Sequence, residues 1–379
     1  MYHYQETDTY FAQTAEEVKD IAQAELRALG AVETRSDYRG IHFSAPPKNF
    51  YAINYRGRLF SRVLAPLTVF WCRSERDLYR GAAAIAWEDF LDPGRTFAVS
   101  ASVSRSCVKH SRYAALRVKD AVVDYFRERT GKRPAVDTRN PDVGVHLYLA
   151  GNKATLSVDA SGGSLHRRGY RHDGLTAPMA ETVAAAVLAY AEWEGETPLY
   201  DPFCGSGTIL CEAYMRASKI PAGFLRPSFG FERFPDFDAD LWRTVREEAE
   251  SGIRPVAPGA VSGSDVSPDA VRAALRNCSA IDPEGRVKIV ESDVFDLEGL
   301  ENTTIVCNPP YGLRLGKGAD LGNFYRRLGD FLKQRCRGAT AYIYFGNREF
   351  IKNIGLKPSW KRLLVSGGLE GRLAKYELY

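Results

Sequence analysis

The sequence lacks the features of a membrane or secreted protein. No run of apolar residues approaches the roughly eighteen that are needed to span a bilayer. Residues 1–11 are polar and contain no apolar signal region, so secretion is not expected. The seven cysteines are scattered without a Cys-x-x-Cys pair, which argues against disulfides and zinc and fits reduced cytoplasmic thiols. We therefore expect a cytoplasmic protein that does not enter the membrane.

The glycine-rich turn at residues 201–208 does not match the common phosphate-binding loops. It is too short for a Walker loop and lacks the third glycine of the dinucleotide fingerprint. Asp201 would repel a phosphate but would attract the ammonium and sulfonium groups of S-adenosylmethionine. The glycines permit a close approach of the backbone to a ligand, and Ser206 or Thr208 is expected to cap the following helix. A purely structural turn is the alternative. The expected cofactor contacts here are Asp201, Phe203, Cys204, Gly205, Ser206, Gly207 and Thr208.

Further predicted strands end in side chains that suit the same ligand. The strand at residues 260–265 ends in Asp265, which could bind a ribose diol, as in other nucleotide-binding α/β folds. The strand at residues 287–293 ends in Asp293, which could accept a hydrogen bond from an adenine amine. Each aspartate could instead be a helix cap. Because parallel strands present their carboxyl ends at one edge of a sheet, we expect these groups to meet there. The contacts assigned to this edge are Asp265, Val266, Asp293, Val294 and Asn308.

The stretch Asn308-Pro309-Pro310-Tyr311 gives the most specific chemical indication. It follows the apolar residues 304–307, and two successive prolines end a strand because they lack a backbone N–H. The Asn308 side-chain oxygen and the Pro309 carbonyl could accept hydrogen bonds from an exocyclic amine, which would aim the nitrogen lone pair at a sulfonium methyl. Tyr311 would stack on the base. We assign catalysis to Asn308, Pro309, Pro310 and Tyr311; a plain strand-ending turn is the alternative.

Charge is distributed unevenly along the chain. Residues 1–172 contain 26 Lys and Arg against 19 Asp and Glu, a net charge of +7, whereas the remaining residues have a net charge of −3. This surplus indicates nucleic-acid binding by the first half, although a solvated helix face would give the same count. The basic residues expected to contact RNA here are Lys109, Arg112, Arg117, Lys132 and Arg133.

The first half has an α+β pattern. Helices are predicted at residues 15–29, ending at Gly30, and at residues 112–130. Residues 143–149 and 154–159 are expected to pair through the turn Gly151-Asn152. Other strands are predicted at residues 4–10, 40–43, 62–72 and 96–102.

Taken together, these motifs resemble the THUMP-domain class I S-adenosylmethionine-dependent RNA guanine-N2 methyltransferases, which act on bacterial large-subunit rRNA or on tRNA. The resemblance rests on the glycine-rich turn, residues 263–265, Asn308-Pro309-Pro310-Tyr311-Gly312, residues 367–373 and the junction at residues 165–171. It implies an α/β fold with a C-terminal Rossmann-like methyltransferase domain at residues 165–379, built on a mostly parallel seven-stranded sheet. An α+β ferredoxin-like subdomain at residues 1–60 and a THUMP RNA-binding domain at residues 61–164 would precede it. The aromatic insertion between the glycine-rich turn and Asp265 also fits this family.

The resemblance further implies a cofactor and a partner. S-adenosylmethionine is the expected methyl donor, Ala177 and Pro178 are expected near its methionine end, and no metal is expected. RNA is the expected partner, rRNA first and tRNA second, with the target base flipped out or single-stranded. The junction mixes charge with stacking capacity, and its expected RNA contacts are His166, Arg167, Arg168, Tyr170 and Arg171. Salt bridges to domain surfaces are the alternative for these residues.

Two other functions remain open from the sequence. The Asn-Pro-Pro-Tyr motif serves adenine N6 as well as guanine N2, so an adenine-N6 methyltransferase is the first alternative. A noncatalytic RNA-binding or ribosome-assembly factor with the same fold is the second. Longer relatives carry a second fused methyltransferase domain, whereas this sequence stops at Tyr379, so a single modification is expected.

Overall fold

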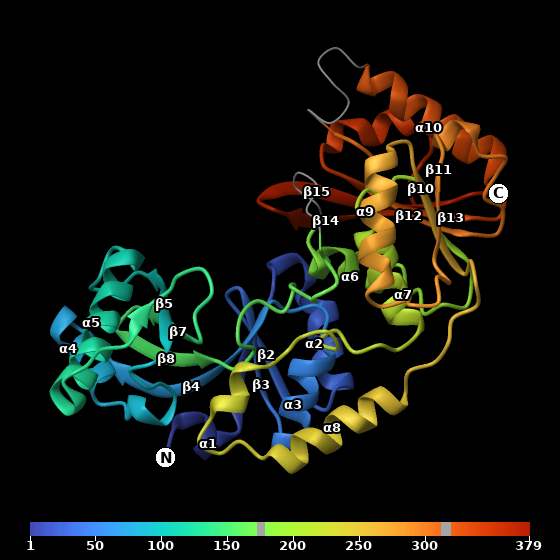
Figure 1. The fold of residues 1–379 in the computed structure, drawn as a ribbon. Helices are drawn as coiled ribbons and strands as arrows, with labels where there is room; N and C mark the ends of the chain where they lie inside the picture. The colour runs from blue at the N-terminus through green and yellow to red at the C-terminus, as the bar shows by residue number, and fades with distance from the viewer. Residues whose placement is uncertain (173–178, 312–319) are drawn as a thin grey trace. The chain divides into compact units, whose positions relative to one another are not determined.

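The computed structural model describes residues 1–172, 179–311 and 320–379. These form two compact units, drawn in Figure 1. The first unit consists of Met1–Leu165 and Arg226–Glu248, and the second of His166–Leu225 and Ala249–Tyr379. The chain therefore leaves the second unit after Leu225, contributes a segment to the first, and returns. The predicted domain division placed that segment in the methyltransferase domain.

The first unit is built on one mixed sheet, which has the strand order β2-β3-β1-β4-β8-β7-β5-β6 within the described residues. Strand β4 joins the two halves of this sheet, because it pairs with β1 on one side and with β8 on the other. The predicted subdomain boundary at residue 60 falls just before this shared strand. The strands are β1 (Thr9–Gln13), β2 (Glu33–Asp37), β3 (Gly40–Ser44), β4 (Arg62–Trp71), β5 (Thr96–Ser104), β6 (Ala135–Val136), β7 (Val143–Ala150) and β8 (Lys153–Asp159).

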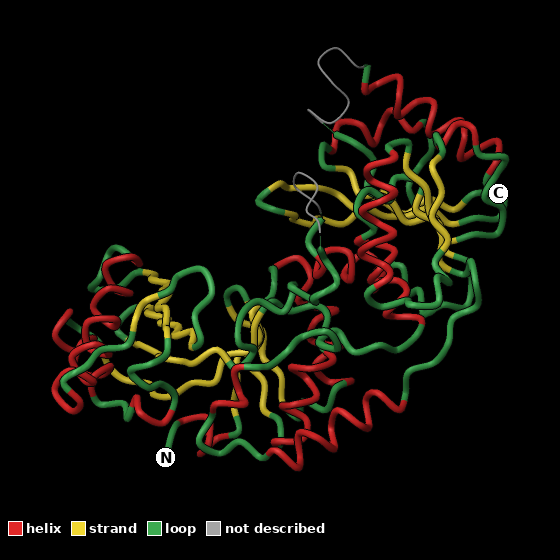
Figure 2. The backbone as a smooth tube through the Cα atoms, viewed as in Figure 1, coloured by secondary structure: helices red, strands yellow, loops and turns green. Residues whose placement is uncertain are grey.

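Helices cover one face of this sheet. Helix α5 packs on β5 and β7, and α2 packs on β2 and β3; Figure 2 shows α4 and α5 in red to one side of the yellow strands. Along β7 every second residue is buried, which is the pattern of a strand with one covered face. The helices of this unit are α1 (His3–Thr7), α2 (Lys19–Ala28), α3 (Pro47–Arg56), α4 (Glu75–Ala83), α5 (Ser111–Thr130) and α8 (Ala239–Ser251), whose last turn belongs to the second unit.

The N-terminal strand prediction is wrong in its first part. Residues 4–10 were expected to form one strand, but α1 occupies most of this stretch and β1 begins only at Thr9. The Tyr2 N–H donates to the Gln5 side chain, which caps the short helix, and Asp8 in the left-handed conformation ends it. Local hydrogen bonding therefore overrides the strand preference of the tyrosines.

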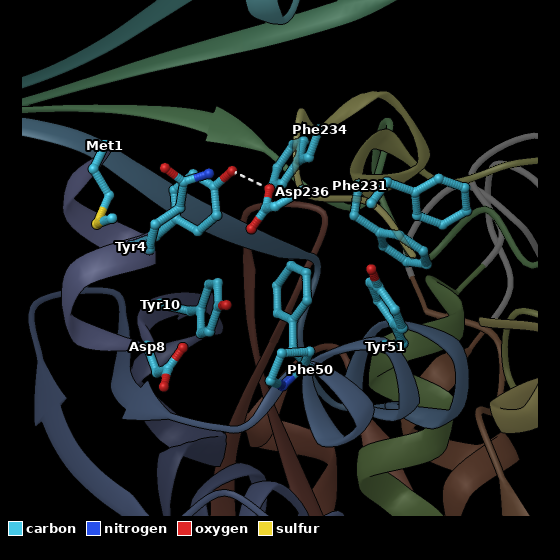
Figure 3. Close-up of a pocket in the computed structure, with 12 residues that line it drawn as sticks. Met1, Tyr4, Asp8, Tyr10, Phe50, Tyr51, Phe231, Phe234 and Asp236 are labelled. Carbon is cyan, nitrogen blue, oxygen red and sulfur yellow. Dashed lines mark hydrogen bonds between the residues drawn. The ribbon is translucent and has the colours of Figure 1, made fainter. Parts of the chain in front are cut away.

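The inserted segment completes an aromatic cluster in the first unit. Phe231 stacks on Tyr51 of α3 with ring centroids 4.6 Å apart, and Phe50 packs edge-on against Phe231. The Tyr4 hydroxyl donates a 2.6 Å hydrogen bond to the carboxylate of Asp236. A cavity of about 370 Å³ opens among these rings (Figure 3). Residues 226–248 are thus part of the core of the first unit.

The second unit confirms the predicted fold class. Its described residues form a seven-stranded sheet with the order β11-β10-β9-β12-β13-β15-β14. The first five strands of this order are parallel, and β15 runs antiparallel to β13 and to β14. The strands are β9 (Leu199–Asp201), β10 (Val261–Asp265), β11 (Lys288–Glu291), β12 (Thr304–Cys307), β13 (Thr340–Phe345), β14 (Trp360–Ser366) and β15 (Leu369–Glu377).

The helices of the second unit pack on this sheet and leave its carboxyl edge for a ligand. Helix α10 covers the face formed by alternate residues of β12, β13 and β15, while α6, α7 and α9 pack side by side. The strand order reverses between β9 and β12, and open α/β sheets bind ligands at the carboxyl ends beside such a point. The helices are α6 (Glu181–Tyr190), α7 (Thr208–Ala217), α9 (Pro268–Ser279) and α10 (Leu321–Arg335). Within the described ranges, no helix has the length and apolar character to cross a membrane.

Candidate active site

Polar side chains from neighbouring strands gather at the carboxyl edge of the second sheet. In the register of the sheet, Asp201 lies opposite Gly263, and Asp265 lies opposite Glu291. Strand β12 lies on the other side of β9 and ends one residue before Asn308. The structure therefore brings the predicted strand ends to one edge, at the point where the strand order reverses.

The glycine-rich turn is fastened to the adjacent strand. The carboxylate of Asp265 accepts hydrogen bonds from the backbone N–H groups of Gly205 (2.9 Å) and Ser267 (3.0 Å), and the Cys204 N–H donates to the Ser264 carbonyl. Gly205 and Gly207 have φ values of +52° and +80°, in the region that favours glycine. A Cβ on Gly205 would meet no atom within 4 Å, so the space beside the turn is open to a ligand.

Asp201 is a buried acid beneath this turn. Its side chain is 1% exposed, and one carboxylate oxygen accepts a 3.0 Å hydrogen bond from the Phe203 N–H. Burial, reinforced by the nearby Asp265 carboxylate, raises the pKa of Asp201 well above its usual range. A cationic ligand at this edge would stabilise the ionised form. This fits the ammonium-bearing cofactor predicted from the sequence.

The next two strand ends show an exposed apolar side chain and an aspartate engaged as a cap. Val266, directly after Asp265, is 67% exposed, which is unusual for a large apolar side chain and leaves it free to contact a flat ring. Asp293 accepts a hydrogen bond from the Phe295 N–H, so it caps the short 3₁₀ helix at Val294–Asp296, while Val294 is buried. One Asp293 oxygen is thus engaged as a cap, the alternative recognised in the sequence.

The Asn-Pro-Pro-Tyr stretch forms the corner after β12. The Asn308 side-chain oxygen is buried and has no hydrogen-bond partner among the described residues. Such an atom costs stability unless a ligand satisfies it. The Pro310 carbonyl accepts a 3.3 Å hydrogen bond from the hydroxyl of the fully buried Tyr325. The Tyr311 ring lies so close to Gly346 that any side chain at position 346 would overlap it.

The cysteines at this edge are buried thiols. Burial raises the pKa of Cys204 and of Cys307 well above the usual range, so neither is a thiolate near neutral pH. Thiolate nucleophiles therefore do not contribute to the chemistry that this edge can perform. Across the described ranges, no cluster of three or more His, Cys, Asp or Glu side chains is arranged to hold a metal ion.

Two junction residues that were predicted to contact RNA are instead buried in the second unit. Arg168 and Tyr170 are each 1% exposed, and both donate 3.2 Å hydrogen bonds to the same oxygen of Glu212 on α7. Their prediction as RNA contacts is corrected, because side chains so deeply buried do not reach a macromolecular ligand. Arg168 forms a buried ion pair with Glu212, and Tyr170 adds a hydrogen bond to the same carboxylate.

Arg171 links the glycine-rich turn to the start of α6. Its guanidinium donates to Glu181, to the hydroxyls of Ser206 and Thr208, and to the Met179 carbonyl, at 3.0 to 3.3 Å. The N-cap of α7 is Gly207, which makes no side-chain cap bond, so the predicted capping by Ser206 or Thr208 is wrong. These hydroxyls serve Arg171 instead.

The other predicted contacts have varied settings. Lys109, Arg112, Lys132, Arg133 and Arg167 are exposed, while Arg117 and His166 are half-buried. Ala177, Pro178 and Gly312 lie outside the described residues. The first group therefore remains a prediction for RNA binding that the surface position permits.

Several contributors to the site could not be assigned from local sequence. Tyr325 holds Pro310 from fifteen residues away, and the Asn277 side chain donates to the Ser206 carbonyl and accepts from the His172 N–H. Glu212 did give a signal, because it is an acid within the apolar helix α7 and such a residue needs a partner. For Tyr325 and Asn277 the sequence offers no comparable signal.

Comparison with protein families finds matches along most of the chain. Residues 168–375 match a model described as RMKL-like, methyltransferase domain, residues 72–159 match the THUMP domain, and residues 9–64 match the RlmL ferredoxin-like domain. The chain is 39% identical to the Synechocystis protein slr0064, whose name proposes RNA methyltransferase activity, over 98% of this chain and 97% of that protein. It is 37% identical to the ribosomal RNA large subunit methyltransferase K/L of Syntrophotalea carbinolica, over 97% of this chain but only 53% of that protein. This chain thus spans about half the length of the K/L relatives.

Solved structures resemble both units at once. A methyltransferase-like protein, SMU.472, crystallised with S-adenosylhomocysteine, aligns with a TM-score of 0.85 at 26% identity over 98% of each chain. A protein from Listeria monocytogenes, described as a predicted N6-adenine-specific DNA methylase, aligns with a TM-score of 0.84 at 27% identity, over 98% of this chain and 97% of that one. The fold, the polar side chains at the sheet edge and the family matches all indicate a methyltransferase.

Proposed function

The chain belongs to the RMKL-like methyltransferase family and is S-adenosylmethionine-dependent, and from this premise we propose that it methylates the N2 amine of a guanosine in ribosomal RNA. The observation that carries the chemistry is the buried side-chain oxygen of Asn308 at the carboxyl end of β12, which has no hydrogen-bond partner among the residues that the structure describes. The RNA class is supported by the THUMP match and by the names of the relatives.

The bound cofactor would supply an electrophilic methyl group and would leave as neutral S-adenosylhomocysteine. The residues that would hold it are those of the glycine-rich turn, with Asp201 below the turn and Val266 beside it. The open space at Gly205 and the exposed apolar surface of Val266 fit a ligand that is cationic at one end and aromatic at the other.

The protein's own part in the reaction is to position the amine. Asn308 would accept a hydrogen bond from the substrate N–H through its buried oxygen, which draws the nitrogen out of conjugation with the base. The two prolines hold this corner stiffly, and Tyr325 fixes it from behind through the Pro310 carbonyl. The nitrogen loses its proton after methyl transfer, so a strong base is unnecessary. Tyr311 is the candidate for stacking on the base.

A second candidate, adenine-N6 methylation, is favoured by the description of the Listeria structure and by the shared motif. Both targets can be separated in one experiment. Labelled S-adenosylmethionine and the purified protein are incubated with total RNA from a strain that lacks the gene, and nucleosides from fractionated rRNA and tRNA are analysed by mass spectrometry. Label in N2-methylguanosine supports the proposal, whereas label in N6-methyladenosine overturns the base assignment. Label in neither, with cofactor binding intact, overturns the proposal.

A further inference from the structure

We propose that the helix-free face of the first unit's sheet binds unpaired RNA nucleotides by stacking them on exposed aromatic side chains. The proposal rests on the RNA substrate class proposed above and names where that RNA is held. We call this surface the open sheet face. The residues that define it are Arg35, Tyr38, Arg39, Trp71, Tyr148 and Lys153.

The strand register places the central residues on one face. Trp71 at the end of β4 lies opposite Lys153 on β8, and Thr155, two residues further along β8, lies opposite Tyr148 on β7. Directly paired residues and residues two apart share a face of a sheet, so Trp71, Lys153, Thr155 and Tyr148 point to the same side. The alternate residues of β7, such as Leu147, are buried beneath the helices. The aromatic rings therefore point away from α5.

The aromatic residues on this face are unusually exposed. Trp71 is 71% exposed, Tyr38 57% and Tyr148 36%. The neighbouring strand β5 presents the exposed small residues Ser102 and Ser104 in register with β7, so no bulky side chain from β5 stands beside Tyr148. The exposed rings of Trp71 and Tyr148 are stacking surfaces for bases, which all have a π-face.

The tip of the β2–β3 hairpin adds cationic groups to the same surface. The guanidinium of Arg39 lies 5.3 Å from the ring centroid of Tyr38. The pKa of His42 is lowered by burial and also by the positive charges of Arg35 and Lys153. Arg35 and Lys153 therefore both lie near His42 on the sheet. The pKa of Tyr148 is raised, first by burial and then by the nearby Asp37 and Tyr38 of the hairpin. The hairpin tip and the Trp71–Tyr148 region thus form one surface.

Charge on this surface favours a polyanion. Two acids of β2 lie on the same side of the sheet as Arg35: the exposed Glu33, and Asp37, whose carboxylate lies 3.1 Å from His42 and 3.9 Å from Arg35. Arg39 and Lys153 form no ion pair with any of the described residues, so their charges stay available to a polyanion. On α5, by contrast, basic residues are balanced by acids of the same helix: Asp120 lies near Arg117 and Lys119, and Asp124 pairs with Arg127. Cations interleaved with open rings are the combination that holds single-stranded RNA. The occupant is therefore unpaired RNA rather than duplex.

The test measures binding of the full chain to a fluorescent, unstructured RNA of about 12 nucleotides, within the range of known single-strand sites. Trp71→Ala and Tyr148→Ala are each expected to weaken binding by about 5- to 100-fold, the range for loss of one stacked base. Trp71→Phe should retain most of the affinity because it keeps a ring. The matched control is Tyr113→Ala, since Tyr113 is 40% exposed but lies on α5, and its affinity should not change.

A second measurement separates charge from stacking. Lys153→Ala should reduce the slope of log affinity against log salt by about 0.7, the value for one contact to single-stranded phosphate. The thermal melting profile of each variant serves as the folding control, and S-adenosylhomocysteine affinity should stay unchanged, because the residues that would bind it lie in the other unit. Unchanged RNA affinity in Trp71→Ala and Tyr148→Ala would overturn the proposal, and a loss in Tyr113→Ala alone would place the RNA on α5. If the wild type methylates guanosine N2 but these variants bind RNA with wild-type affinity, the proposal for the open sheet face is wrong and the proposed function is still supported.

Discussion

The hydroxyl of Tyr325 donates a 3.3 Å hydrogen bond to the carbonyl oxygen of Pro310, and its ring stacks on Phe350 with centroids 4.8 Å apart. A buried tyrosine on α10 thereby holds the corner that presents Asn308. Tyr325→Phe keeps the ring and removes the bond, which should cost about 1 kcal/mol of positioning, or roughly fivefold in kcat. Single-turnover methyl transfer measures this. An unchanged kcat would mean that the prolines alone fix the corner.

Removing the amide acceptor should affect catalysis far more. Asn308→Ala is expected to lower kcat by about 100- to 1000-fold, the cost of losing one preorganised hydrogen-bonding group in an active site. RNA affinity, measured by anisotropy on the same preparation, should stay within about twofold, because the RNA-binding face that we propose lies in the first unit. Turnover within a few-fold of the wild type would show that Asn308 does not position the amine.

Asp201 should link cofactor binding to pH. Burial raises the pKa of Asp201, so the ligand-free fold favours the protonated carboxyl. The stability that this raised pKa provides is lost as the pH rises through the folded-state pKa, because the buried carboxyl then has to ionise. Asp201→Asn should therefore melt at a higher temperature than the wild type above that pKa, yet bind S-adenosylmethionine at least about tenfold more weakly.

The wild-type affinity should also fall as the pH drops through the raised pKa of Asp201, since a neutral carboxyl does not attract the ammonium group. Asp201→Asn should show no such fall. Titration calorimetry at several pH values compares the two proteins. If the affinities of the two proteins depended on pH in the same way, the group that titrates would not be Asp201.

Gly207 is constrained twice, by its conformation and by its neighbour. Its φ is +80°, and a Cβ would lie 3.1 Å from the Cβ of Ala274 on α9. Gly207→Ala should lower the free energy of unfolding by about 2–3 kcal/mol. Gly131→Ala is the matched control, because Gly131 has a φ of +68° with no atom within 4 Å of the added carbon, and should cost only about 1 kcal/mol. Urea denaturation measures the free energy of unfolding of both variants. Equal losses would show that α9 moves away from the added carbon at no energetic cost.

The buried pair of Arg168 and Glu212 should matter for stability and not for RNA. Arg168→Ala leaves a carboxylate buried without its cation, which typically costs about 3–5 kcal/mol. The salt dependence of RNA binding should keep its wild-type slope, provided that the assay is run well below the melting temperature. A stable variant with a reduced slope would restore the RNA contact inferred from the sequence.

The comparison between sequence and structure separates local from distant information. Asp201, Asp265 and Asn308 were placed correctly at one sheet edge because strand, turn and helix are encoded within a few residues of each. The prediction that Arg168 and Tyr170 contact RNA is wrong, because the local sequence of an arginine near an aromatic residue is the same whether the side chains face RNA or a buried glutamate. Only the distant Glu212 decides between these readings.

Distance in sequence likewise hid the partners of the active-site corner. Nothing near Tyr325 indicates that its hydroxyl reaches Pro310, and nothing near Phe231 indicates that it stacks on Tyr51. The open sheet face was hidden for a related reason, because Trp71, Tyr148 and Lys153 become neighbours only through strand pairing. Periodicity predicts which elements form but not which side chains meet.

The excursion of residues 226–248 into the first unit bears on how such a protein can be inherited and dissected. The polypeptide passes between the units three times, after Leu165, Leu225 and Glu248. A gene fragment that ends at residue 165 would encode a first unit without Phe231 or Asp236, and one that begins at residue 166 would carry both residues without Tyr51 and Tyr4, their partners in the first unit. A single recombination event after Leu165, Leu225 or Glu248 would therefore split at least one of the two units, so the units cannot be exchanged whole in one step.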